Sequence, residues 1–125
     1  MVMNALAVFF GGAFGALFRF LISEFLPVIK WGMPFTIIGV NFFGCFVMGF
    51  LDSLCENKIP STQVKHFLMI GLLGGFTTFS TFSLEFSNLV KQGNIMHSFV
   101  YVFLSVFTAI AGFWIGYWLA KIIKR

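Results

Sequence analysis

The residues from Gly71 to Glu85 combine side chains that an ordinary membrane helix does not use together. The stretch reads GLLGGFTTFSTFSLE and holds two adjacent glycines, five hydroxyl residues and three phenylalanines. Glycine is a poor helix former, and irregular backbone at membrane depth persists only where it is buried in protein or lines a wet cavity. The pair Gly74 and Gly75 therefore predicts a break in a helix, and such a break predicts a site.

Beyond the expected break, helical spacing sorts the side chains into two neighbouring rows. Phe79, Phe82 and Phe86 share one face, and Thr78, Thr81 and Glu85 share the next. An aromatic row beside a polar row is an unusual lining for a membrane helix. The alternative is that the phenylalanines only pack and that the hydroxyls bond back to their own i−4 carbonyls.

Asn41 is the one strongly polar residue inside the apolar run PFTIIGVNFFGCFVMGF. A buried amide must find hydrogen-bond partners, and in lipid these come from another helix or from the freed backbone of a broken one. Gly39, Gly44 and Gly49 keep the helix around Asn41 thin enough for another helix to approach. We therefore expect the interrupted stretch at Gly74 to supply the partners.

The first apolar run carries a small-residue motif and a cation. Gly11 and Gly15, at i and i+4, let another helix approach closely. Arg19 lies one turn further on, where a cation near the membrane centre costs about 2.5 to 3.5 kcal/mol on insertion scales. Two interpretations stay open for Arg19: its side chain snorkels toward the end marked by Glu24, or it stands at the mouth of an anion path.

Hydroxyl groups form a second row in the last apolar run. Tyr101, Ser105 and Thr108 lie at i, i+4 and i+7. Taken alone, such hydroxyls bond to backbone carbonyls of their own helix. Because the third run carries its own hydroxyl row, we expect the two rows to face one another.

Composition defines the fold class. The chain has 125 residues, of which 59% are hydrophobic and 10% charged, with a mean hydropathy of +0.98, so it is an integral membrane protein. Four runs are long enough to cross a hydrocarbon core, which takes about 20 helical residues. We place them at residues 5–26, 34–54, 66–90 and 96–120. A single all-α domain of four spans over residues 1–125 leaves too little chain for an enzyme's loop scaffold.

Charged and sulfur-containing residues point to the membrane as well. The net charge of +4 comes from span ends, where Lys and Arg snorkel, and gives no nucleic-acid signal. Cys45 and Cys55 match no metal-binding spacing and are interpreted as apolar filler.

The basic residues also bear on orientation in the membrane. If the spans alternate, the side of both termini holds Lys58, Lys65, Lys121, Lys124 and Arg125. The other side holds Lys30 and Lys91, with Arg19 leaning to it. This modest bias favours cytoplasmic termini and also fits insertion in both orientations.

Three motifs together resemble the Fluc family of small bacterial fluoride channels. They are GxxxGALxR from Gly11 to Arg19, VNxxG from Val40 to Gly44, and GGFTTFSTFSLE from Gly74 to Glu85. The resemblance covers most of the chain, and the third motif is the most specific. The sequence departs from the family at Thr36-Ile37, where Gly-Thr is usual, and in the fourth run, which keeps only part of the family's serine and threonine pattern.

The resemblance implies an antiparallel, dual-topology homodimer in the bacterial cytoplasmic membrane, with a third helix broken near Gly74 to Thr77. Such a dimer carries two pores for passive fluoride efflux and a structural sodium ion between its subunits. By the same resemblance, the residues take these roles: Phe79, Phe82, Asn41, Ser80, Thr81, Tyr101 and Ser105 at the pore; Arg19 in a vestibule; Glu85 and Thr108 in gating or a polar track; and the carbonyls of Gly74 and Thr77 on sodium.

The chemistry of fluoride agrees with these implied roles. Fluoride is small and hard, so leaving water requires dense compensation from hydrogen-bond donors, which Ser, Thr, Tyr and Asn offer. A phenyl ring is negative on its face and positive at its rim, so edge-on rings favour an anion without trapping it. Conduction needs such weak, multiple sites.

Two other classes compete with a channel. Small multidrug exporters also use four spans, but they resemble one another through a membrane-embedded glutamate early in the first span, and AVFFGGAFGA at residues 7–16 holds no acid. A structural subunit would use its polar residues only to join helices. Fluoride flux against chloride flux separates all three classes.

Overall fold

Four long apolar helices make up the computed structural model, which describes residues 1–27, 30–56 and 60–125. Each of the four is long and apolar enough to cross a membrane, which confirms the predicted number of spans within this part of the chain. The spans are Val2–Phe25, Phe35–Cys55, Thr62–Lys91 and Ile95–Ile123. The first starts three residues earlier and the last ends three residues later than expected. Lys58, assigned from sequence to the side of the termini, lies outside the described residues.

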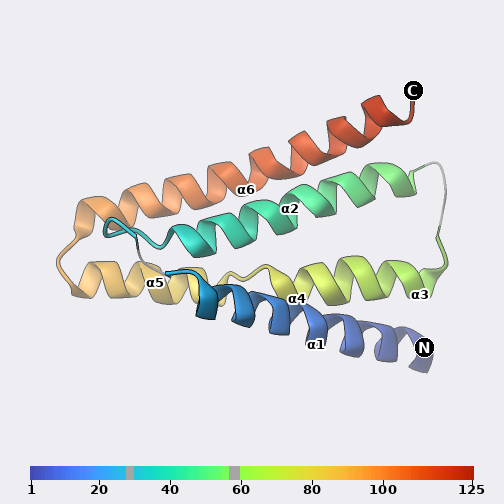
Figure 1. The fold of residues 1–125 in the computed structure, drawn as a ribbon, viewed down its shortest axis with the longest axis horizontal. Coiled ribbons are helices and arrows are strands. Elements are labelled where there is room, and N and C mark those ends of the chain that lie inside the picture. The colour runs from blue at the N-terminus through green and yellow to red at the C-terminus, as the bar shows by residue number, and fades with distance from the viewer. Residues whose placement is uncertain (28–29, 57–59) are drawn as a thin grey trace.

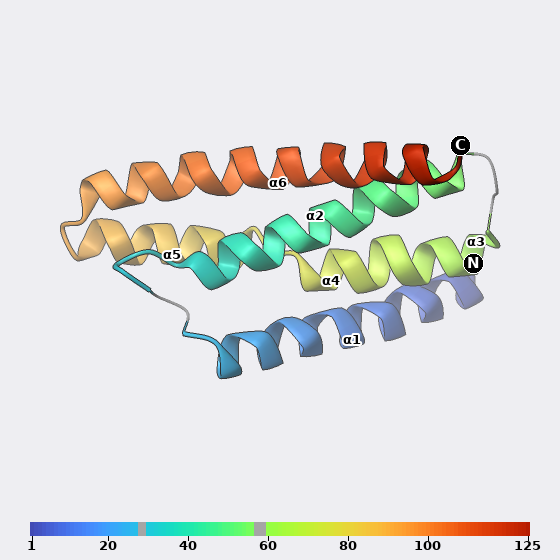
Figure 2. The ribbon, with the colours of Figure 1, turned by 45° about the horizontal axis from the view of Figure 1, so that its top comes forward.

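The third span consists of several segments, whereas the other three are continuous helices. Helix α1 covers Val2–Phe25, α2 covers Phe35–Cys55 and α6 covers Ile95–Ile123. The third span runs through α3 (Thr62–Lys65), a π-helix η1 (His66–Leu73), α4 (Gly74–Phe76) and α5 (Ser80–Lys91). In Figures 1 and 2, α2 and α6 run side by side, while α1 lies along the first half of the third span. Both termini lie at the end of the molecule where α3 begins.

The expected break in the third span is present, and it follows the glycine pair. Gly74 and Gly75 belong to the short helix α4, and the non-helical residues are 77–79. Thr77 is extended, with φ −76° and ψ 152°. Both glycines are therefore helical despite their poor helix propensity, and the break begins at Thr77.

Close packing between α1 and the third span explains Gly71 and Gly75, whereas a Cβ atom at Gly74 would make only an ordinary contact of 3.8 Å with the Met69 carbonyl oxygen. A Cβ atom added at Gly75 would lie 2.7 Å from the carbonyl oxygen of Gly12, and one at Gly71 would lie 2.9 Å from Gly11 Cα. Gly11 and Gly15 are buried in the same contact. The small-residue motif of the first span thus has a matching set of glycines on its partner, as the approach of two helices in lipid requires.

We expect Gly75→Ala to destabilise the protein, because the three atoms nearest the added methyl are backbone atoms of Gly12, which cannot move aside as a side chain can. Overpacking typically costs about 1 to 3 kcal/mol. Gly39→Ala is the matched control, since a Cβ atom at that helical position meets nothing within 4 Å. Thermal unfolding in detergent should show a lower Tm for Gly75→Ala and an equal or higher Tm for Gly39→Ala. Equal Tm values for wild type and Gly75→Ala would contradict this account of the α1 contact.

A tight turn before α2 fixes the end of the helix that carries Asn41. The N–H and C=O groups of Lys30 and Met33 pair with one another at 2.8 and 3.0 Å. Trp31 and Gly32 supply the two positive φ angles, 53° and 75°, that such a turn needs. Met33 then joins a buried cluster whose other members are Ile37, Ile38, Phe82, Leu89 and Tyr101. This cluster ties α2, α5 and α6 together directly beside the break.

Candidate functional site

The break opens onto a groove of about 460 Å³ between α2, the third span and α6. Its wall is mainly apolar, with amide, hydroxyl and backbone groups concentrated at the break. The lining residues are Asn41, Cys45, Gly74, Thr77, Thr78, Phe79, Phe82, Ser105, Val106, Ala109 and Ile110. The structure therefore brings Asn41, Phe79, Phe82 and Ser105 together from three different spans.

The side chain of Asn41 replaces helical hydrogen bonding at Thr78. Its Nδ2 donates to the Thr78 carbonyl at 3.0 Å, and its Oδ1 accepts from the Thr78 N–H at 2.8 Å. This double contact confirms the prediction that the amide finds its partners on the broken third span. An amide nitrogen has two N–H groups, so Asn41 keeps a second donor at the groove.

Two groove-lining residues, Gly74 and Thr77, have backbone carbonyls that lose their helical donors at the break. In an uninterrupted helix the N–H of residue i donates to the carbonyl of residue i−4. The Thr78 N–H bonds to Asn41 and not to Gly74, and the Thr81 N–H bonds to Thr78 Oγ1 at 3.1 Å and not to Thr77. The carbonyls of Gly74 and Thr77 are thus left as oxygen acceptors beside the groove, which both residues line.

The Thr78 hydroxyl organises the start of α5. It accepts from the Thr81 N–H and lies 3.2 Å from the hydroxyl oxygens of both Ser80 and Thr81. Sequence reasoning placed Thr78 on a polar face but did not select it as a site residue. The available signal was its position three residues before Thr81 at a helix start, where Ser and Thr cap backbone donors.

The two phenylalanines at the break differ sharply in exposure. Phe79 lies in the non-helical segment and is 75% exposed, whereas Phe82 in α5 is 8% exposed. Their ring centroids are 5.0 Å apart, and the Phe82 centroid lies 5.2 Å from that of Tyr101. The aromatic row therefore runs from the exposed Phe79 ring, through the buried Phe82 ring, to the fully buried Tyr101 ring of α6.

The hydroxyl row on α6 divides between the groove and its own helix. Ser105 lines the groove, and within the described part of the chain neither its hydroxyl nor that of Tyr101 has a hydrogen-bond partner, although both are buried. Thr108 is different, because its hydroxyl donates to the Leu104 carbonyl at 2.6 Å. The expected facing of the two hydroxyl rows thus holds for Ser105, while Thr108 bonds to its own helix.

The remaining predicted site residues lie off the groove lining. Arg19 is half-buried on α1, and Glu85 is half-buried on α5. Ser80 and Thr81 contact the groove region through their hydrogen bonds to Thr78. Among the residues that the structure describes, no cluster of His, Cys, Asp or Glu could hold a metal ion, so a cation at the break would rely on carbonyl oxygens.

Fold and groove together define a small four-span membrane protein whose third span is interrupted to expose backbone and side-chain polar groups. Comparison with known proteins identifies the group to which it belongs. Residues 6–117 match the family described as "CrcB-like protein, Camphor Resistance (CrcB)". The chain is a member of this family.

Relatives of similar length support that membership. The chain is 38% identical over 113 residues to the "Fluoride-specific ion channel FluC" of Chlorobium phaeobacteroides, covering 90% of this chain and 88% of that protein. It is 37% identical over 123 residues to the protein of that name from Hydrogenovibrio crunogenus, covering 96% and 92%. With the Campylobacter jejuni protein the identity is 37% over 125 residues, covering 97% and 100%.

Proposed function

We propose that this chain is a fluoride-selective channel that lets fluoride leave the cell passively across the bacterial cytoplasmic membrane. The observation that carries the proposal is the groove at the break, where Asn41, Ser105 and the Phe79 ring converge. The relatives bearing the name of a fluoride-specific channel match nearly the whole chain. Because they are named as channels, the same relatives also favour a channel over an exporter or an enzyme.

The groups at the groove suit a small, strongly hydrated anion. Asn41 offers its second N–H, and the buried Ser105 hydroxyl offers a donor with no other partner in the described structure. Phe79 adds a largely exposed ring, and the positive edge of a ring suits an anion. None of these groups carries a full positive charge, so together they favour fluoride without holding it too tightly to leave.

The other residues take supporting roles in this proposal. Phe82 and Tyr101 continue the aromatic row behind Phe79. Ser80 and Thr81 belong to the polar track that Thr78 connects. From the motifs, we place Arg19 in the vestibule and Glu85 and Thr108 in gating or the polar track. The structure supports Thr108 in the track less than Glu85, because the Thr108 hydroxyl bonds to its own helix.

A second, antiparallel copy of the chain completes the channel. Phe79 is 75% exposed in the single chain, and each chain brings the Gly74 and Thr77 carbonyls to the side of the break that lines the groove. A twofold axis through the break doubles these to four oxygens, enough to surround a sodium ion. Unwound carbonyls hold sodium in this way at broken helices of transporters. The sodium is structural, because it joins the two subunits.

We expect exhaustive removal of sodium, with an organic cation in its place, to reduce fluoride flux and weaken the dimer. The carbonyls would then face one another without a cation or donors, which is costly for buried backbone groups. Cross-linking and flux should be measured on the same sample before and after sodium is restored. Full assembly and full flux without sodium or a substitute cation would contradict the sodium site.

We expect a cysteine placed beside Lys124 to be labelled from both sides of the membrane. The variant Ile123→Cys, in a background with Cys45→Ala and Cys55→Ala, carries one thiol near the C-terminus. An antiparallel pair presents this end to both sides, and the modest charge bias permits both insertions. Labelling from one side only, in cells making this chain alone, would require a fixed topology and a different assembly.

Growth in fluoride of a bacterium that lacks its own fluoride exporter tests the function in cells. We expect the chain to restore growth in fluoride and to give no protection against quaternary ammonium compounds. The measurement with quaternary ammonium compounds separates a fluoride channel from a four-span multidrug exporter. Protection against the ammonium compounds without protection against fluoride would overturn the proposal.

A further inference from the structure

Helix α6 is long enough for its ends to leave the hydrocarbon core. It spans 29 residues, which at 1.5 Å per residue gives about 43 Å, against a core of about 30 Å. Its C-terminal turns carry Trp114, Tyr117, Trp118 and Lys121, and the two tryptophans are 51% and 54% exposed. Aromatic rings followed by basic residues are typical of the boundary between acyl chains and headgroups.

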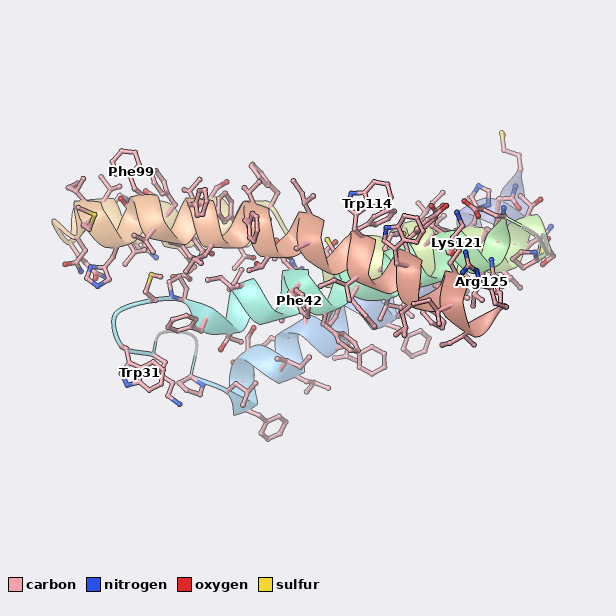
Figure 3. The ribbon with its side chains drawn as sticks, turned by 90° about the horizontal axis from the view of Figure 1, so that it is seen from above. Trp31, Phe42, Phe99, Trp114, Lys121 and Arg125 are labelled. Atoms are coloured by element: carbon pink, nitrogen blue, oxygen red, sulfur yellow. The ribbon has the colours of Figure 1, made fainter. Side chains whose placement is uncertain are left out.

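Cations and rings at this end form a cluster with fixed geometry. The Lys121 Nζ lies 5.0 Å from the Tyr117 ring centroid and 5.2 Å from that of Trp118, so its ammonium group rests on two rings at once. Tyr117 also packs edge-on against Trp114 and Trp118 at 5.5 and 5.8 Å. Figure 3 shows Lys121 and Arg125 near one another over the last turns of α6. We name Trp114, Tyr117, Trp118, Lys121, Lys124 and Arg125 the C-terminal cluster.

Two contacts with the end of α2 hold this cluster in place. The Tyr117 hydroxyl donates to Glu56 Oε1 at 2.5 Å, and the Lys124 ammonium donates to the Ser53 carbonyl. The carboxylate of Glu56 is thereby engaged by a neutral hydroxyl. The ammonium group of Lys121 is positioned by its aromatic neighbours, which reduces the entropy lost when it binds a ligand.

From this arrangement we propose that the C-terminal cluster binds the phosphodiester of an anionic phospholipid. Charge complementarity and depth in the membrane favour this ligand, because Lys121, Lys124 and Arg125 concentrate positive charge where the α6 helix enters the headgroup layer. Anionic lipids are attracted to basic residues near the membrane surface. The exposed Trp114 and Trp118 rings lie one to two turns deeper and contact the acyl chains.

Quenching of tryptophan fluorescence by brominated lipids tests the proposal on the intact protein. Trp31 lies at the opposite end of the molecule, so Trp31→Phe leaves only Trp114 and Trp118 as reporters. We expect brominated phosphatidylglycerol to quench more effectively than brominated phosphatidylcholine. The double variant Lys121→Gln, Arg125→Gln should lower this selectivity by at least about fivefold, from the attraction of one basic residue near the surface.

Two further variants sharpen the comparison. Lys91→Gln removes a lysine at the other end of the molecule and should leave the selectivity unchanged, whereas Glu56→Gln removes a nearby negative charge and should raise it. Inorganic phosphate added in place of lipid should not reverse the quenching. Equal quenching by the two lipids, an equal loss in Lys91→Gln, or displacement by phosphate alone would each overturn the proposal. The assay measures no flux, so its outcome is independent of the proposed channel function.

Discussion

Replacing both rings with Phe79→Ile and Phe82→Ile is expected to reduce fluoride flux by about tenfold to a hundredfold. An aliphatic side chain keeps bulk but has no positive edge for an anion. If each lost edge costs as much as an edge-to-face aromatic pair gains, about 0.5 to 1.5 kcal/mol, two rings account for a change of this size. Phe79 is 75% exposed, so its replacement leaves the folded subunit nearly intact. The measurement is fluoride efflux from liposomes that contain equal amounts of folded protein.

Phe103→Ile is the matched control for the ring substitutions. Phe103 is 70% exposed on α6, stacks on Phe107 and does not line the groove. The control should conduct like the original chain, and the single variants should show whether the open Phe79 or the buried Phe82 matters more. Full fluoride flux in the folded double variant would show that the rings serve packing alone.

The second large effect is expected from Asn41→Asp, which should abolish most fluoride flux. An ionised carboxylate still accepts from the Thr78 N–H but cannot donate to the Thr78 carbonyl, and leaving a buried carbonyl without its donor costs about 1 to 3 kcal/mol. It also removes the second N–H from the groove and places a negative charge beside the anion path. Flux and thermal stability should be measured on the same preparation.

Asn88→Asp provides the control for the added charge, since Asn88 lies near the far end of α5 and away from the groove lining. Its flux should match that of the original chain. If Asn41→Asp conducts normally while its Tm falls, Asn41 only joins α2 to the third span and has no part in conduction.

The contact between Asn41 and the third span could be predicted from sequence because few partners exist for an amide inside a membrane. A buried polar group requires a partner, and the stretch at Gly74 was the one place where backbone groups were expected to be free. The same logic could not place the break at residues 77–79. By sequence alone, Gly75 predicts a helix break, because the reason for a glycine there is its close approach to Gly12 on α1. That approach is a tertiary contact, which the sequence does not reveal.

Helical periodicity also could not predict the exposure of the two rings in the aromatic row. Phe79 and Phe82 share a face if the helix is continuous, but Phe79 precedes α5, so one ring is open and the other buried. The π-helical geometry of His66–Leu73 has no comparable signal in the residue pattern, because i→i+5 bonding is rare and is selected by the surrounding packing. Thr108 shows the local alternative for a hydroxyl, a bond to its own helix.

Fluoride efflux from liposomes that contain only this purified chain, measured with a fluoride electrode beside a matched chloride experiment, tests the central claim most directly. The groove at the break predicts rapid passive fluoride efflux, little chloride efflux and no need for a proton gradient. Equal efflux of the two halides, or fluoride movement only when a proton gradient is imposed, would contradict a fluoride-selective channel.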